Sequence, residues 1–244
     1  MFKNNIFTFL FCLLLSLNLA AQKPSVKEDT KKPKKEKTFE DIITKEAITD
    51  KGLFDIHKVK EKYYYEINDT LFGREMLMVT RIAKTASGLG FGGGKQNTQV
   101  LRWQKKDNKI LLRVVSHNVV ASDSLPVNEA VLNSNFEPIL YSFKIESKGI
   151  DSTSTLIEVT KLFSEDVKPL GFPQSRRKGY KISSLNSKKS FIESIKSYPE
   201  NIESRHVKTY NSSSPPSNSS TGTISLEINN SGVEPRNVPS SPAE

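Results

Sequence analysis

The sequence is poor in cysteine, histidine and tryptophan, and beyond its first residues it has no long apolar run. Of 244 residues, one is Cys, one is Trp and three are His. Cys12 lies inside the apolar N-terminal run, so the rest of the chain has neither disulfides nor a thiol nucleophile. With 12 Gly, 12 Pro and 36% hydrophobic side chains, the composition excludes collagen-like, disulfide-stapled and wholly disordered proteins. A globular protein of one or two domains remains.

The first 21 residues have the organisation of a secretory signal peptide. Lys3 gives a positive start, residues 6–17 are almost entirely apolar, and residues 19–21 end in small side chains suited to cleavage. The apolar run is shorter than the roughly 20 residues that span a bilayer, and Cys12 lacks the preceding small residues of a lipid-modified cysteine. We therefore expect export to the periplasm, the outer membrane or the medium of a Gram-negative bacterium.

Positive charge is concentrated in Lys23–Lys37. The formal net charge is +9, and this stretch carries seven Lys against three acidic residues. With Val26 as its one large apolar residue, it cannot bury enough surface to fold, so we expect residues 22–37 to be a disordered linker. The alternative is a weak contact with anionic lipid or polysaccharide of the envelope. No nucleic-acid partner is expected, because the chain is predicted to be exported and the stretch has no aromatic residues on which bases stack.

From residue 38 onward the pattern is mainly that of β-strands. Alternating apolar and polar residues at 141–146 predict an antiparallel hairpin with 155–162, and the continuous apolar run at 75–82 predicts a strand covered on both faces. Further strands are predicted at 53–59, 63–67, 98–104, 110–120, 202–210 and 223–228, and helices at 39–47, 127–133 and 187–198. Because strands and helices do not alternate strictly, we expect a mainly β fold of the α+β class with antiparallel sheets.

A glycine-rich loop is the only short motif with a chemical precedent. Gly88, Gly90 and Gly93 have the G-x-G-x-x-G spacing, but a dinucleotide site requires a helix directly after the motif, and here a strand is predicted. We therefore expect a flexible connection between two strands. If the loop binds a peptide or another domain, it does so by close approach of its backbone. The candidate contact residues are Gly88, Gly90, Gly92, Gly93 and Gly94.

The sequence offers no set of residues for a metal or catalytic site. His57, His117 and His206 are far apart, and none belongs to a short ligand spacing such as HExxH. The paired carboxylates at 165–166 and the basic residues at 176–178 lie in a predicted solvated loop. We therefore assign no catalytic, cofactor-binding or metal-binding residue to this chain.

Longer strings of residues resemble the N-terminal region of large secreted bacterial zinc-dependent metalloproteases. These strings are Phe39–Ala47, Gly52–His57, Gly73–Lys84, Gly88–Gly94, Thr98–Trp103, Ser204–Tyr210, Ser213–Ser220 and Thr223–Ile228. In that family, two domains of uncharacterised function precede the catalytic domain. The resemblance implies that the zinc ligands and the general base lie downstream, in an HExxHxxGxxH-type helix that this sequence does not contain. No catalytic residue is therefore carried over.

The resemblance also implies a domain organisation and a function. The predicted parts are a signal peptide (1–21), a Lys-rich linker (22–37), a small helix-plus-hairpin domain (38–84), an incomplete β-rich second domain (85–231) and a disordered tail (232–244). The polar, Pro-rich tail departs from the family and indicates a truncated or split gene product. We expect a non-catalytic region that packs on, folds or shields a metalloprotease catalytic domain, which holds the zinc. The alternative is a free-standing exported β-rich module that binds peptide or envelope glycan.

Overall fold

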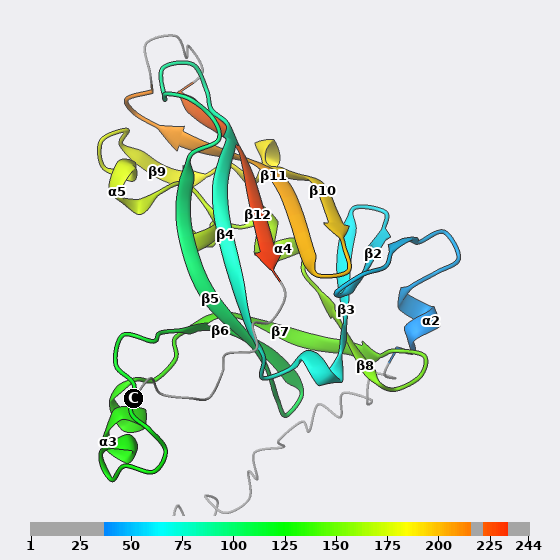
Figure 1. The fold of residues 1–244 in the computed structure, drawn as a ribbon. Coiled ribbons are helices and arrows are strands. Elements are labelled where there is room, and N and C mark those ends of the chain that lie inside the picture. The colour runs from blue at the N-terminus through cyan, green and yellow to red at the C-terminus, as the bar shows by residue number, and fades with distance from the viewer. Residues whose placement is uncertain (1–36, 216–221, 234–244) are drawn as a thin grey trace, which may run out of the picture. The chain divides into compact units, whose positions relative to one another are not determined.

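The computed structural model of the chain describes residues 37–215 and 222–233. These residues form a mainly β fold of the α+β class, as the sequence predicts, and every strand pairing among them is antiparallel (Figure 1). None of the helices in these two ranges is both long and apolar enough to cross a membrane.

Strands dominate the order of elements. The strands are β1 (Ile48–Asp50), β2 (Asp55–Val59), β3 (Lys62–Asn68), β4 (Glu75–Lys84), β5 (Lys95–Lys106), β6 (Lys109–Val115), β7 (Ile139–Lys148), β8 (Ser154–Glu158), β9 (Ile182–Leu185), β10 (Phe191–Ser197), β11 (Asn201–Ser212) and β12 (Thr223–Val233). The α-helices are α2 (Phe39–Ile42), α3 (Val127–Ser134), α4 (Thr160–Ser164) and α5 (Gln174–Arg177), and the 3₁₀ helices are η1 (Asp69–Leu71), η2 (Lys168–Leu170) and η3 (Ser187–Lys189).

The strands form one sheet that nearly closes on itself. Its order is β1-β2-β3-β8-β7-β6-β5-β4-β12-β11-β10, with β9 pairing with β11 off this path. The two ends of this order meet, because the Leu53 amide before β2 donates to the Tyr198 carbonyl after β10 at 2.8 Å. Close by, the Ser197 amide donates to Asp50 Oδ2 at 3.0 Å. The sheet therefore has an inner and an outer face.

The inner face holds the main apolar core. Trp103 of β5 lies at its centre, with its ring centroid 5.8 Å from that of Phe54 and 5.5 Å from that of Phe143. Helix α4 adds Leu162 and Phe163 to the same core. Since full burial of such a side chain contributes about 1.5–3 kcal/mol, this core is the main source of stability in a fold without disulfides.

Two smaller clusters lie beside the main core. On the outer face, Phe39 and Ile42 of α2 pack on Tyr64 and Leu156. The start of α2 is fixed by a capping box. The Thr38 hydroxyl accepts from the Asp41 amide, and the Asp41 carboxylate accepts from the Thr38 amide. The other cluster includes side chains of β4, β11 and β12 together with Leu89 of the glycine-rich loop.

Several boundaries differ from the sequence predictions. The strand predicted at 155–162 ends at Glu158 and is followed by α4, and the helix predicted at 39–47 ends at Ile42. Strand β4 alternates between buried and more exposed residues, so the prediction that both its faces are covered is wrong. A residue pattern alone does not distinguish a strand covered on both faces from one whose second face is partly open.

The predicted amphipathic helix at 187–198 is wrong. The segment forms η3 and β10, and β10 pairs with β11 through the tight turn at Pro199 and Glu200. The Tyr198 amide donates to the Asn201 carbonyl across this turn at 2.8 Å. Its β-branched Ile192 and Ile195 suit a strand as well as a helix, and pairing with a long neighbouring strand decides between the two.

The two domains predicted at 38–84 and 85–231 contribute strands to the same sheet. Strand β4 pairs with β5 and β12, and β3 pairs with β8, so the sheet continues across the predicted boundary at 84 and 85. The predicted signal peptide (1–21), linker (22–37) and tail (232–244) lie outside the described residues, except at their edges. Residues 232 and 233 belong to β12, so the predicted disordered tail begins too early.

Candidate functional site

The inner face of β11 carries a row of buried polar side chains. Ser204, His206, Lys208 and Tyr210 alternate along the strand, and the last three are 0% exposed. Buried polar groups require hydrogen-bond partners, since an unpaired group costs about 1–3 kcal/mol. Most of these partners belong to residues 165–172, a stretch inside the sheet that we call the internal segment.

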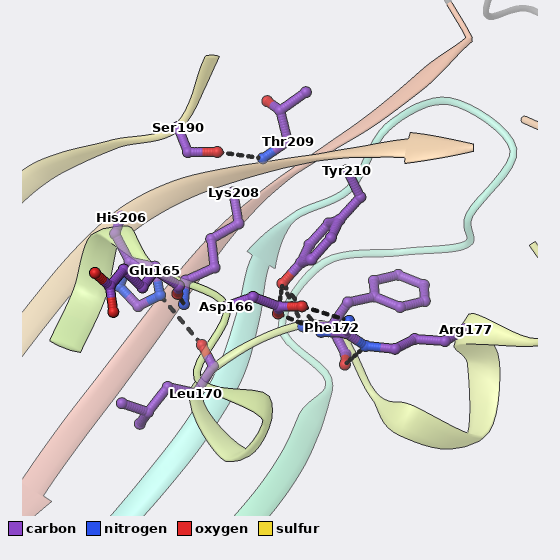
Figure 2. Close-up of polar contacts among 10 residues, drawn as sticks. All are labelled: Glu165, Asp166, Leu170, Phe172, Arg177, Ser190, His206, Lys208, Thr209 and Tyr210. Carbon is purple, nitrogen blue, oxygen red and sulfur yellow. Dashed lines mark hydrogen bonds and ion pairs between the residues drawn. The ribbon is translucent and has the colours of Figure 1, made fainter. Parts of the chain in front are cut away.

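His206 and Lys208 both bind backbone carbonyls of the internal segment (Figure 2). Lys208 Nζ donates to the Glu165 carbonyl at 2.6 Å, and His206 Nε2 donates to the Leu170 carbonyl at 3.2 Å. Burial lowers the pKa of Lys208 to about 8 and that of His206 to about 3, with the neighbouring Lys208 charge adding to the latter shift. His206 is therefore neutral near pH 7, with its proton on Nε2.

Tyr210 joins the internal segment to an ion pair (Figure 2). Its hydroxyl accepts from the Phe172 amide at 3.0 Å and donates to Asp166 Oδ1 at 3.4 Å. Arg177 donates to both oxygens of Asp166, at 2.7 and 2.6 Å. Burial raises the pKa of Asp166, but the Arg177 hydrogen bonds and charge outweigh it, so the pKa is lower than usual. Burial raises the pKa of Tyr210 to about 12.

Two further strands bind the same segment. Thr80 of β4 and Asn97 of β5 both donate to the Pro169 carbonyl at 3.3 Å. The polar side chains of three strands, β4, β5 and β11, thus satisfy backbone groups of a segment that pairs with no strand among the described residues. Because their polar atoms point at this backbone or at one another, they fix the segment and do not present a reactive group to solvent.

Sequence reasoning missed this internal polar cluster, which consists of Asp166, Arg177, His206, Lys208 and Tyr210. It placed 165–166 and 176–178 in a solvated loop, which is wrong for Asp166 and Arg177, whose side chains are 29% and 11% exposed. The available signal was in β11, where polar residues occupy alternate positions continuous with the apolar Ile202. A row of polar side chains on the inner face of a strand indicates that these side chains form hydrogen bonds with the backbone of a segment packed against that face.

The three histidines lie in separate surroundings. His57 Nδ1 accepts from the Thr49 hydroxyl at 2.8 Å, and its Nε2 donates to Glu66 at 3.0 Å. His117 Nε2 lies 2.8 Å from Glu75 Oε2, on an exposed part of the sheet. In the ranges that the structure describes, no three His, Cys, Asp or Glu side chains gather as a metal site.

The contacts of His57 follow the order hydroxyl, imidazole, carboxylate. This order is also that of a nucleophile, a base and an orienting acid. Here it joins β1, β2 and β3, with Thr49 directly opposite His57 in the register. His57 is 4% exposed, and the Phe39 ring stands edge-on to it at 5.6 Å. The arrangement therefore ties three strands together beneath α2.

The glycine-rich loop connects β4 and β5, as the sequence predicts. Gly88, Gly90 and Gly93 have φ values of 86°, 91° and 88°, which favour glycine. A Cβ at Gly92 would collide with the Ala83 carbonyl, and Gly94 completes the return to β5. The structure shows no partner at this loop, so its role as a contact site stays a prediction.

The most exposed apolar part of the described chain is the connection between β6 and β7. This connection together with Ile139, the first residue of β7, is here called the α3 segment (residues 116–139), and it contains seven of the twelve large hydrophobic side chains that are exposed in the described ranges. They are Val119, Val120, Leu125, Val127, Leu132, Phe136 and Ile139. No residue of α3 is buried, and Figure 1 shows α3 on a lobe beyond the ends of β6 and β7. The strand predicted at 110–120 ends at Val115, where this connection begins.

A cavity of about 70 Å³ lies inside the sheet beside the internal segment. Its wall is largely apolar and includes Met76, Met78, Trp103 and Leu170. Two polar side chains, those of Ser204 and Asn230, also line it.

Two protein families match consecutive parts of the chain that forms this nearly closed antiparallel sheet. Residues 36–85 match the family described as Domain of unknown function (DUF5118), and residues 93–235 match the family described as Domain of unknown function (DUF5117). Because the second match covers more than half of the chain, the protein belongs to the DUF5117 family. Among curated proteins and among solved structures, no match was found. The prediction of two consecutive regions of uncharacterised function is confirmed.

Proposed function

We propose that this chain is the non-catalytic region of an exported zinc-dependent metalloprotease, and that it packs on a catalytic domain through the α3 segment. The observation that carries the proposal is the set of seven exposed large hydrophobic side chains in residues 116–139. Exposed apolar surface of this density marks sites of protein interaction. The resemblance of the chain to the N-terminal region of metalloproteases supports the choice of partner.

The charge of the α3 segment supports a specific docking surface. Its three charged residues, Asp123, Glu129 and Glu137, are all acidic, although the whole chain has a net charge of +9. A complementary partner surface has an apolar centre and basic residues at its rim. Burying Leu132 and Phe136 in such a centre would contribute about 1.5–3 kcal/mol each.

The C-terminal end of the α3 segment is fixed to the sheet. Arg113 of β6 donates to the Glu137 carbonyl at 2.8 Å, and its guanidinium lies 4.9 Å from the centre of the Phe136 ring. Arg102 of β5 forms an ion pair with the Glu137 carboxylate. These contacts hold Phe136 in place before a partner binds, which lowers the entropy that this side chain loses on binding.

The function that follows is to position or cover a catalytic domain. Zinc, its ligands and the general base belong to that domain, and no residue of this chain is assigned to them. Export of the complex is part of the proposal and rests on the N-terminal sequence, residues 1–21.

Surface plasmon resonance tests the proposal. The full chain is immobilised, and the analyte is a separately produced HExxHxxGxxH-type catalytic domain encoded in the same genome. We expect a Kd of roughly 1 μM or tighter. The double substitution Leu132→Asp and Phe136→Asp should weaken binding by at least about tenfold, since it removes two apolar contacts. Absence of binding would contradict the proposal.

A matched control separates the α3 segment from exposed apolar surface in general. Ile150 is 74% exposed in the turn between β7 and β8, outside the α3 segment. Ile150→Asp should leave the affinity unchanged. Equal weakening by Ile150→Asp and by the double substitution would show that the α3 segment has no special role.

One observation favours the alternative, a free-standing module that binds peptide or glycan. Phe91 is 98% exposed in the glycine-rich loop, between Gly90 and Gly92. An exposed aromatic ring on a loop is suited to stacking on a sugar or an apolar side chain. Envelope glycan fragments that bind the chain but not Phe91→Ala, without any catalytic domain present, would favour this alternative.

A further inference from the structure

We propose that one end of the sheet binds the surface of a membrane with anionic phospholipid headgroups. This basic end consists of the connection between β4 and β5 with its flanks (84–95), the stretch from α5 to the start of β10 (173–191), and the ends of β11 and β12 between them (209–215 and 222–226). Two observations carry the inference. All charged residues of this end are basic, and its glycine-rich loop exposes an aromatic ring.

The parts of the basic end are in direct contact. Strand β9 pairs with β11, β11 pairs with β12, and β12 pairs with β4 beside the glycine-rich loop. Tyr180 and Ile182 pack on the same apolar cluster as Leu89 of the loop. Figure 1 shows the loop, β9 and α5 at the same end of the sheet. A partner at this end can therefore contact the loop and the stretch from α5 to β10 together.

The charge of the basic end is of one sign. It contains eight of the 36 Lys and Arg residues of the chain and none of the 27 Asp and Glu residues. Since the formal net charge of the whole chain is +9, the rest of the chain is close to neutral. An attraction to anionic surfaces is therefore strongest at this end.

Most of these basic side chains are available to a partner. Two of the eight are paired with acidic residues just outside the basic end, Lys84 with Glu227 at 2.6 Å and Arg177 with Asp166 at 2.6 Å. The other six are exposed and form no ion pair with any residue that the structure describes. They are Lys95, Arg176, Lys178, Lys181, Lys188 and Lys189.

The glycine-rich loop presents Phe91 in an ordered conformation. Phe91 is 98% exposed, whereas Leu89, two residues before it, is 3% exposed and belongs to the apolar cluster. The Thr85 hydroxyl donates to the Gly90 carbonyl at 2.8 Å, which closes the loop on itself. The ring is therefore held in solvent by a loop that is itself tied to the sheet.

The distribution of charge around the ring favours a bilayer over a soluble polyanion. Residues 85–94 carry no charge, and basic residues border them at Lys84 and Lys95. At a bilayer, an aromatic ring enters the boundary of headgroups and acyl chains, while lysines and arginines stay with the phosphates. In an anionic polysaccharide the charges lie on the sugars, so a ring stacked on a sugar would require basic residues beside it in the loop.

Vesicle co-sedimentation of the full chain tests the proposal. One set of vesicles contains phosphatidylglycerol and phosphatidylcholine in equal parts, and the other contains phosphatidylcholine alone. We expect saturable binding to the anionic vesicles and none to the neutral ones. Binding should be lost in high salt, because salt screens the attraction. Absence of binding to the anionic vesicles would overturn the proposal.

Charge-matched variants separate the basic end from the rest of the chain. The test variant combines Lys178→Gln, Lys188→Gln and Lys189→Gln, and the control combines Lys106→Gln, Lys109→Gln and Lys148→Gln, which are equally exposed positions outside the basic end. The test variant should weaken binding to anionic vesicles by at least about tenfold, and the control by no more than about twofold. Equal weakening would place the binding elsewhere, because both variants keep the Lys-rich residues 23–37.

Two substitutions of Phe91 test insertion of the ring. Phe91→Ala should weaken binding to anionic vesicles by about fivefold, because the ring enters only the boundary of the bilayer. Phe91→Trp reports the surroundings of this position, since the single tryptophan of the chain, Trp103, is 6% exposed and lies in the main core. The fluorescence of Phe91→Trp should shift to shorter wavelength on anionic vesicles, and that of the unmodified chain should not. Absence of this shift would contradict insertion.

Polygalacturonate, an anionic polysaccharide without an apolar layer, is the competing ligand. At an equal concentration of negative charge, it should not displace the chain from anionic vesicles. Displacement, together with equal binding of Phe91→Ala and the unmodified chain, would show that the basic end recognises polysaccharide and that the lipid proposal is wrong. The inference does not depend on the proposed function, because no catalytic domain is present and the α3 segment is unchanged.

Discussion

Asp166 and Arg177 form a bidentate ion pair beside Tyr210, near the C-terminal end of β11. Arg177 Nη1 lies 2.7 Å from Asp166 Oδ2, and Nη2 lies 2.6 Å from Oδ1. Arg177 Nε also donates to the Phe172 carbonyl at 3.2 Å, and its guanidinium lies 4.9 Å from the centre of the Tyr210 ring. One guanidinium therefore connects α5 to the internal segment and to β11.

Removing the carboxylate of this pair should destabilise the fold. Asp166→Ala leaves the largely buried Arg177 without its counter-charge, which we expect to cost about 1–3 kcal/mol of unfolding free energy. Urea denaturation monitored by Trp103 fluorescence measures the change. Arg176→Ala is the matched control, because Arg176 is an exposed neighbour in the same helix. Equal stability of Asp166→Ala and the unmodified chain would show that the pair does not hold the internal segment.

The stability of the protein should fall in acid because of His206. Burial lowers its folded-state pKa from 6.5 to about 3, so between these values the unfolded chain binds more protons than the folded one. Stability from this group is present above pH 6.5 and is lost toward pH 3, by at most about 1.4 kcal/mol per pH unit. The lowered pKa of Asp166 acts in the same direction at the acid end.

The substitution His206→Gln separates the contribution of His206 to the loss of stability in acid from that of the carboxylates. Its amide can donate to the Leu170 carbonyl, but it does not titrate. Urea denaturation between pH 6.5 and pH 4.5 should show a shallower loss of stability for His206→Gln than for the unmodified chain. Parallel curves would mean that His206 gains its proton without unfolding, contrary to its full burial.

The sequence predicts the antiparallel sheet better than the internal polar cluster. Alternation at 141–146 and β-rich runs at 202–210 are local signals, and the structure has strands at both places. The pairing of Asp166 with Arg177 depends on how a connector folds back inside the sheet, and no local pattern records it. The helix predicted at 187–198 is wrong because pairing with β11 outweighs a period that suits either element.

The α3 segment shows a second limit of the sequence. The strand predicted from the sequence at 110–120 includes Val119 and Val120. In the structure these side chains are 53% and 69% exposed. Hydrophobic composition does not distinguish a core from a surface that a partner covers.

The purified chain should show no zinc-dependent peptidase activity. The proposed function assigns the zinc ligands and the general base to another domain, so added zinc or a chelator should not change the cleavage of a casein substrate. A heat-inactivated sample sets the background. Chelator-sensitive cleavage above that background would assign catalysis to this chain and contradict the proposed division of roles.

Hydrogen–deuterium exchange of the chain with and without a metalloprotease catalytic domain tests the docking claim most directly. We predict that exchange of backbone amides slows in residues 116–139 on binding, and that the turn containing Ile150 and the glycine-rich loop exchange as before. Protection confined to other surfaces, or no protection at a concentration of catalytic domain that saturates the chain, would contradict the account.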